Sequence, residues 1–93
     1  MSQTERDIVV NANHDLAWRS VVYLNGERQT HCLEYRVKSE SFMRPAAGEL
    51  IIACLADGQL MHTSIDPQPP DSFPYRGQFW ARRVTGQVFV DLV

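Results

Sequence analysis

The sequence predicts a small all-β protein, in which three hairpins form an antiparallel curled sheet, sandwich or barrel. Three dipeptides typical of tight turns, Asn25-Gly26, Asp57-Gly58 and Thr85-Gly86, lie between segments that favour strands. A hydrophobic content of 44% and a charged content of 22% are typical of a globular protein. With 93 residues, the chain is expected to form a single domain over 1–93, with residues 1–7 flexible.

The first hairpin is predicted to follow a short strand at Ile8-Val9-Val10. Residues 16–24 place apolar side chains on one face at a period of two, which favours a strand over the competing helix. The Asn25-Gly26 turn then returns the chain, because these residue types accept the positive φ values of a two-residue turn. The resulting register pairs Leu24 with Glu27, Val22 with Gln29, Trp18 with Leu33 and Leu16 with Tyr35, and it places Trp18 on the apolar face.

The middle of the chain is expected to hold the central strand. Residues 39–48 predict a loop or one short helical turn, since Arg44-Pro45 interrupts any longer element. Residues 50–56 are apolar on both faces and predict the most buried strand. The Asp57-Gly58 turn is expected to pair Ala56 with Gln59, Cys54 with Met61 and Ile52 with Thr63.

Residues 66–75 contain four of the five prolines, which excludes this segment from the interior of a sheet. The last hairpin is expected over 78–93 about Thr85-Gly86, with apolar residues on both faces. Its final strand would leave an exposed edge at Val93. Because exposed edges readily pair with another chain, this predicts a homodimer.

Charge and composition exclude several classes of function. The net charge of −2 gives the whole surface no general attraction for nucleic acid or anionic lipid. The longest apolar stretch, Leu50–Ala56, is too short to span a membrane. Cys32 and Cys54 do not make a disulfide framework, so we expect free thiols and a cytoplasmic protein of a bacterium or phage.

No residue pattern predicts an enzyme, a cofactor or a metal site. His14, His31, His62 and the two cysteines lack the spacings of metal ligands. On a strand, adjacent residues such as His31 and Cys32 point to opposite faces, which excludes them as a catalytic pair. The run His62-x-Ser64-x-Asp66 would lie on one strand face, where neighbouring side chains diverge instead of forming a relay.

The C-terminal third predicts a binding surface, because aromatic residues interleave there with arginines. These residue types are enriched at the energetic centres of protein interfaces, although ordinary burial of the aromatics is an equally simple interpretation. We therefore expect a non-enzymatic binding module, acting through a protein–protein interface as an accessory, regulatory or inhibitory factor. The expected partner-binding residues are Tyr75, Arg76, Trp80, Arg82 and Arg83.

Two alternative functions remain open from the sequence. The aromatic and arginine residues also suit a small β-barrel that binds RNA or single-stranded DNA. A pocket inside a barrel could instead bind a small ligand, with a lining predicted to consist of Trp18, Tyr35, Met61 and Phe89.

Overall fold

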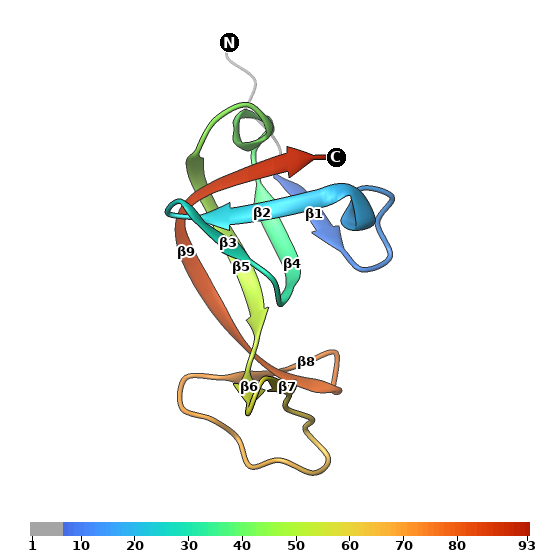
Figure 1. Cartoon of the computed structure of the whole chain (residues 1–93). Coiled ribbons are helices and arrows are strands. Elements are labelled where there is room, and N and C mark those ends of the chain that lie inside the picture. The colour runs from blue at the N-terminus through green and yellow to red at the C-terminus, as the bar shows by residue number, and fades with distance from the viewer. Residues whose placement is uncertain (1–6) are drawn as a thin grey trace.

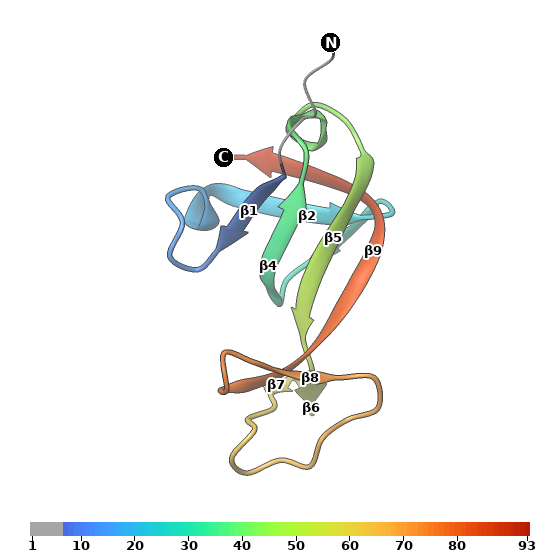
Figure 2. The same cartoon turned by 180° about the vertical axis from the view of Figure 1, so that it is seen from behind.

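The structure is a computed structural model that describes residues 7–93, and it is dominated by one curled antiparallel sheet (Figures 1 and 2). The predicted all-β class is confirmed, and the sheet does not close into a barrel. Its strand order is β1-β4-β5-β9-β2-β3, with β8 added beside β9, while β6 and β7 form a separate two-stranded ribbon. The elements are β1 (Ile8–Asn11), η1 (Ala17–Arg19), β2 (Ser20–Leu24), β3 (Glu27–Gln29), β4 (Cys32–Val37), η2 (Ser39–Phe42), β5 (Ala46–Ala53), β6 (Leu55–Ala56), β7 (Gln59–Leu60), β8 (Phe73–Tyr75) and β9 (Phe79–Leu92).

The flexibility expected for residues 1–7 lies almost wholly outside the described residues, which begin at Asp7. Asp7 itself forms an ion pair with Lys38, at 3.1 Å between the carboxylate and the ammonium group. The strand expected at Ile8-Val9-Val10 is confirmed as β1, which pairs with β4.

The Asn25-Gly26 hairpin is confirmed next to its turn, where Leu24 pairs with Glu27 and Val22 with Gln29. The predicted continuation of this register is wrong, because Trp18 lies in η1 and not in a strand. Local hydrogen bonds compete there with the extended conformation: His14 Nδ1 accepts from the backbone of Leu16, and Ser20 Oγ donates to the Leu16 carbonyl.

Strand β4 does not pair with residues 16–18. The predicted pairs Leu16 with Tyr35 and Trp18 with Leu33 are therefore wrong. This strand lies between β1 and β5, so that Tyr35 is opposite Val10 on one side and Leu50 on the other. A strand with a neighbour on each side satisfies both of its rows of backbone hydrogen bonds, which a strand at the edge of a hairpin cannot do.

The central strand is confirmed as β5, which lies between β4 and β9 and contains the fully buried Leu50. The predicted extent is wrong at its end, because Leu55 and Ala56 are exposed and lie in β6. Strand β5 begins at Ala46, earlier than expected, after the short helical turn η2 that the sequence allows. The chain then leaves the sheet at Cys54, and the Asp57-Gly58 turn forms the β6–β7 ribbon. The expected pairing of Ala56 with Gln59 is confirmed, whereas Ile52 pairs with Arg82 and not with Thr63.

The hairpin predicted at Thr85-Gly86 does not form, because both residues lie inside the continuous strand β9. The φ of Gly86 is not in the left-handed region that a tight turn needs. This glycine instead permits a close approach, since a Cβ atom there would lie 2.8 Å from Asn25 Oδ1. Gly86 pairs with Gly48, and a Cβ atom on Gly48 would lie 2.9 Å from Val37 Cγ1.

The turn that begins β9 lies at Arg76-Gly77, where φ is 51° and 67°. Because arginine seldom adopts a left-handed conformation, this dipeptide is a weak turn signal in sequence. The proline-containing segment Phe73–Tyr75 pairs with β9 as the edge strand β8, in agreement with the exclusion of prolines from a sheet interior.

The C-terminal strand pairs with two other strands instead of folding back on itself as predicted. Strand β9 pairs with β5 along Ala81–Val88 and with β2 along Val88–Leu92. Among the described strands, residues 89–92 pair only with β2, so the end of β9 keeps one unpaired side and the homodimer stays a prediction. The strand order of the sheet ends at β1 and β3.

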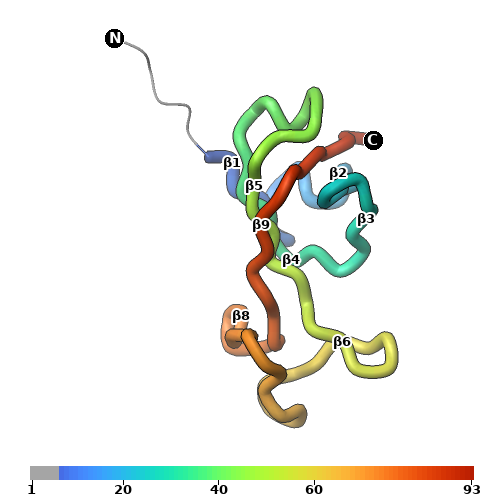
Figure 3. The backbone as a smooth tube through the Cα atoms, turned by 90° about the vertical axis from the view of Figure 1, so that its left-hand side faces the viewer, coloured from blue at the N-terminus to red at the C-terminus, as the bar shows by residue number. Residues whose placement is uncertain are grey.

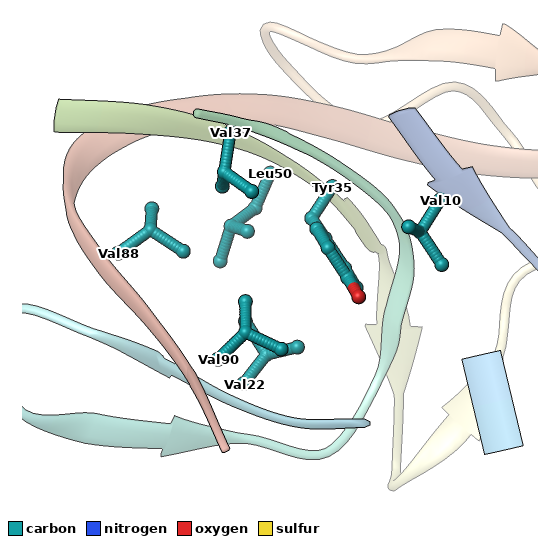
Figure 4. Close-up of a cluster of buried hydrophobic side chains, with 7 residues drawn as sticks. All are labelled: Val10, Val22, Tyr35, Val37, Leu50, Val88 and Val90. Atoms are coloured by element: carbon teal, nitrogen blue, oxygen red, sulfur yellow. The ribbon is translucent and has the colours of Figure 1, made fainter. Parts of the chain in front are cut away.

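The core fills the space that the curled sheet encloses (Figure 4). Side chains from β1, β2, β4, β5 and β9 meet there, and the buried cluster comprises Val10, Val22, Tyr35, Val37, Leu50, Val88 and Val90. Beyond the lower end of β5, the β6–β7 ribbon, the proline-rich loop and β8 form an extension (Figure 3). The molecule is accordingly elongated, with extents of 49 × 28 × 24 Å.

We expect Gly48→Ala to destabilise the fold by about 1–3 kcal/mol, the usual cost of overpacking a core. The new methyl group would lie 2.9 Å from Val37 Cγ1 and 3.0 Å from Val88 Cγ2. Urea unfolding measures this cost. Ala47→Ser, at the exposed neighbouring position, is the control and should change stability by no more than about 0.5 kcal/mol. A Gly48→Ala variant as stable as the parent would contradict the close packing of β5 and β9.

Candidate functional site

A cleft with a volume of about 550 Å³ lies where three parts of the chain converge. One wall is formed by β1 and η1, another by β2 through β4, and the third by the turn between β8 and β9. This volume is typical of sites that receive a small ligand. The cleft is therefore our candidate site.

Tyr75 and Glu34 form the polar contact that joins two of these walls. The Tyr75 hydroxyl donates to Glu34 Oε1 over 3.0 Å, although the two residues are 41 positions apart in the chain. Burial raises the pKa of Tyr75, and the hydrogen bond to the Glu34 carboxylate and its negative charge raise it further. The phenol therefore stays protonated and acts as a fixed donor.

Arg76 lies at the same wall, with its guanidinium 5.6 Å from the centre of the Tyr75 ring. Its φ of 51° is uncommon for a side chain of this kind and costs of order 1 kcal/mol. The turn keeps this conformation and thereby presents Arg76 to the cleft.

Tyr35 and Ser20 lie deeper in the cleft and form a short chain of hydrogen bonds. The Ser20 hydroxyl donates to the Leu16 carbonyl over 2.7 Å. Its oxygen therefore accepts the proton of the Tyr35 hydroxyl, over 2.8 Å. Burial raises the pKa of Tyr35, so the phenol remains neutral.

Cys32 lines the same cleft but is poorly suited to act as a nucleophile. Its thiol donates to the Glu34 carbonyl over 3.2 Å. Burial raises the pKa of the Cys32 thiol to about 11, which leaves very little of the reactive thiolate at neutral pH. The other free thiol, Cys54, is buried.

Trp18 stands at the rim of the cleft and is 80% exposed, although the sequence predicts it on the apolar face of a hairpin. The guanidinium of Arg19 lies 5.9 Å from the centre of the Trp18 ring, and Arg19 Nε donates to the Val93 carbonyl. The Trp18-Arg19 pair combines an aromatic residue with an arginine, as the C-terminal third does, but it lies outside the region in which the sequence predicts a binding surface.

The five predicted partner-binding residues lie in different parts of the structure. Tyr75 and Arg76 line the cleft. Trp80 is half-buried, and its indole N–H donates to the Asp66 carbonyl over 2.9 Å. On β9, adjacent side chains point to opposite faces: Arg82 donates to the Pro70 carbonyl, and Arg83 pairs with the Glu49 carboxylate. The five residues therefore do not share one surface.

The four residues predicted to line a small-ligand pocket also lie in different places. Trp18 and Tyr35 line the cleft, whereas Met61 and Phe89 do not. The ring of Phe89 packs against Tyr23 at 6.0 Å between centroids.

The run from His62 to Asp66 is a turn and not a strand: the backbone of His62 donates to Asp66 Oδ2 over 2.7 Å. Within residues 7–93, no three histidine, cysteine or acidic side chains are grouped closely enough to hold a metal ion. Over the same residues, no helix is long and apolar enough to cross a membrane.

Comparisons of this chain with protein-family models, with curated proteins and with solved structures found no match.

We expect Cys32 to react with iodoacetamide roughly tenfold more slowly in the folded chain than in urea at pH 8. Raising the pKa from 9.0 to about 11 lowers the thiolate fraction about 100-fold, and the greater nucleophilicity of the more basic thiolate restores about tenfold. Peptide-resolved mass spectrometry measures the rate at Cys32 separately from Cys54. A folded-state rate at Cys32 equal to that in urea would contradict the assignment.

Proposed function

We propose that this chain is a non-enzymatic binding module that recognises a protein partner through the cleft and its rim. The single observation that carries this proposal is the 80% exposure of Trp18 next to a cleft that also presents Tyr75 and Arg76. Tryptophan, tyrosine and arginine are the residue types most enriched among interface residues that cost 2 kcal/mol or more when truncated.

The local structure supports this use of Trp18. The backbone of Trp18 lies in a short 3-10 turn, and the guanidinium of Arg19, whose Nε donates to the Val93 carbonyl, lies 5.9 Å from the centre of the Trp18 ring. A side chain that is already positioned loses less entropy on binding than one that must be ordered. A partner that covers Trp18 would also remove a large apolar surface from water, which favours association.

Nucleic acid is the less favoured partner. Arg82 and Arg83, which the sequence suggests for phosphate contact, are engaged by the Pro70 carbonyl and the Glu49 carboxylate. The net charge of −2 also opposes a polyanion. We place the module in the cytoplasm, as an accessory, regulatory or inhibitory factor. The homodimer stays a prediction from the sequence and is not part of this proposal.

The test is capture of the partner from native cytoplasm by the tagged chain, with and without nuclease, followed by titration of the identified partner. We expect Trp18→Ala to weaken the affinity roughly 30-fold, which corresponds to about 2 kcal/mol. Its unfolding midpoint should not change, because the side chain is exposed. Unchanged affinity in this variant, or capture that nuclease abolishes, would contradict the proposal.

Trp80→Ala is the structural counterpart of this variant. We expect it to lower the free energy of unfolding by roughly 2 kcal/mol or more, because Trp80 is half-buried and anchors the loop at Asp66. Urea unfolding of the two tryptophan variants side by side measures the difference. A fully stable Trp80→Ala protein would contradict the anchoring role.

A further inference from the structure

We propose that the cleft receives a cationic side chain, lysine or arginine, of the bound protein, with Glu34 as its counter-ion. This inference rests on the proposed function and specifies the chemistry of the segment that the cleft recognises. It depends on the charge of Glu34, on the direction of the hydrogen bonds around it and on the aromatic surfaces of the cleft.

Glu34 is a half-buried carboxylate without an ion-pair partner among residues 7–93. The ion pairs in this part of the chain join Asp7 with Lys38, Glu40 with Arg44, and Glu49 with Arg83. The negative charge of Glu34 acts inside the cleft, since it contributes to the raised pKa of both Tyr75 and Cys32. A partly desolvated charge of this kind is stabilised when a binding partner supplies the opposite charge.

Two of the donors next to Glu34 are already used within the chain. The Tyr75 hydroxyl donates to Glu34, and the Cys32 thiol donates to the Glu34 carbonyl. Deeper in the cleft, the Tyr35 hydroxyl donates to Ser20, whose own proton is committed to the Leu16 carbonyl. Besides the Arg76 guanidinium, which acts on Tyr75 and lowers its pKa against the larger effect of burial, this wall offers acceptor capacity at the second carboxylate oxygen of Glu34. Lysine and arginine are the side chains that only donate.

The aromatic residues of the cleft suit the rest of such a side chain. Trp18, Tyr75 and Phe79 line it and offer apolar surface to an aliphatic stem and ring faces to a cation. Arg76 is the cation that faces this region, over the Tyr75 ring. Because it would repel a second cation at the rim, we expect the partner's basic residue to lie next to an acidic one that meets Arg76.

The test titrates the ¹⁵N-labelled full chain with four small probes, followed by NMR. Two are cationic, Nα-acetyl-arginine amide and Nα-acetyl-lysine amide. Two are their neutral counterparts, Nα-acetyl-citrulline amide and Nα-acetyl-norleucine amide. We expect the cations to shift amide signals in 32–35 and 75–79 and to bind roughly tenfold more tightly than their neutral counterparts, with a preference that declines as salt is added. The inference is overturned if neither cation is preferred.

Glu34→Gln tests the counter-ion directly, because the amide keeps the shape and can still accept from Tyr75. We expect the preference for the cations to disappear in this variant. Glu27→Gln, which removes the same charge at an exposed position outside the cleft lining, should leave the preference unchanged. A Glu34→Gln protein that still prefers the cations overturns the inference. The salt dependence of the parent chain tests it independently of whether the variant folds.

The two proposals fail in different ways. If Trp18→Ala weakens binding of the captured partner and Glu34→Gln does not, the binding module stands and the cationic side chain is excluded. If Trp18→Ala has no effect on partner affinity, the proposed function itself fails.

Discussion

The structure depends on the close contact between β5 and β9 at the pair Gly48 and Gly86. A Cβ atom at Gly48 would enter the core beside Val37, and one at Gly86 would meet the side chain of Asn25. Because neither glycine carries a side chain, β9 passes close to both β5 and the β2–β3 turn. Asn25 completes this junction by accepting a hydrogen bond from the backbone of Gln87. One strand can therefore pair with β5 along part of its length and with β2 along the rest (Figure 1).

The continuity of β9 also assembles the cleft. Its C-terminal end, Val88–Leu92, pairs with β2, which follows directly after η1 and Trp18. Its N-terminal end pairs with β8, which carries Tyr75 and leads into Arg76. The two rims of the cleft are thus attached to opposite ends of the same strand. The contact between Tyr75 and Glu34 then connects the β8–β9 turn to the wall formed by β4.

The parts of the fold that the sequence could predict are those that local conformation determines. Asn25-Gly26 and Asp57-Gly58 identify turns because their backbone demands are met within a few residues. Gly86 leads to a wrong turn prediction, because glycine occurs both in tight turns and where two segments approach closely. The sequence alone does not show that Asn25 lies next to Gly86. The residues of the candidate site also differ in whether the sequence could predict them. Composition identifies Tyr75 and Arg76, whereas the roles of Trp18 and Glu34 depend on the pairing of β4 with β1 and β5 and on a contact across 41 residues.

Strand β9 is one continuous strand that joins both rims of the cleft. Cross-strand nuclear Overhauser effects in the ¹⁵N,¹³C-labelled chain measure this continuity. We expect contacts of β9 with two different strands, between Arg83 and Ile51 and between Phe89 and Tyr23. A hairpin about Thr85-Gly86 would instead place Arg82 opposite Phe89. Backbone contacts between Arg82 and Phe89, with none from Phe89 to Tyr23, would show that β9 is not continuous.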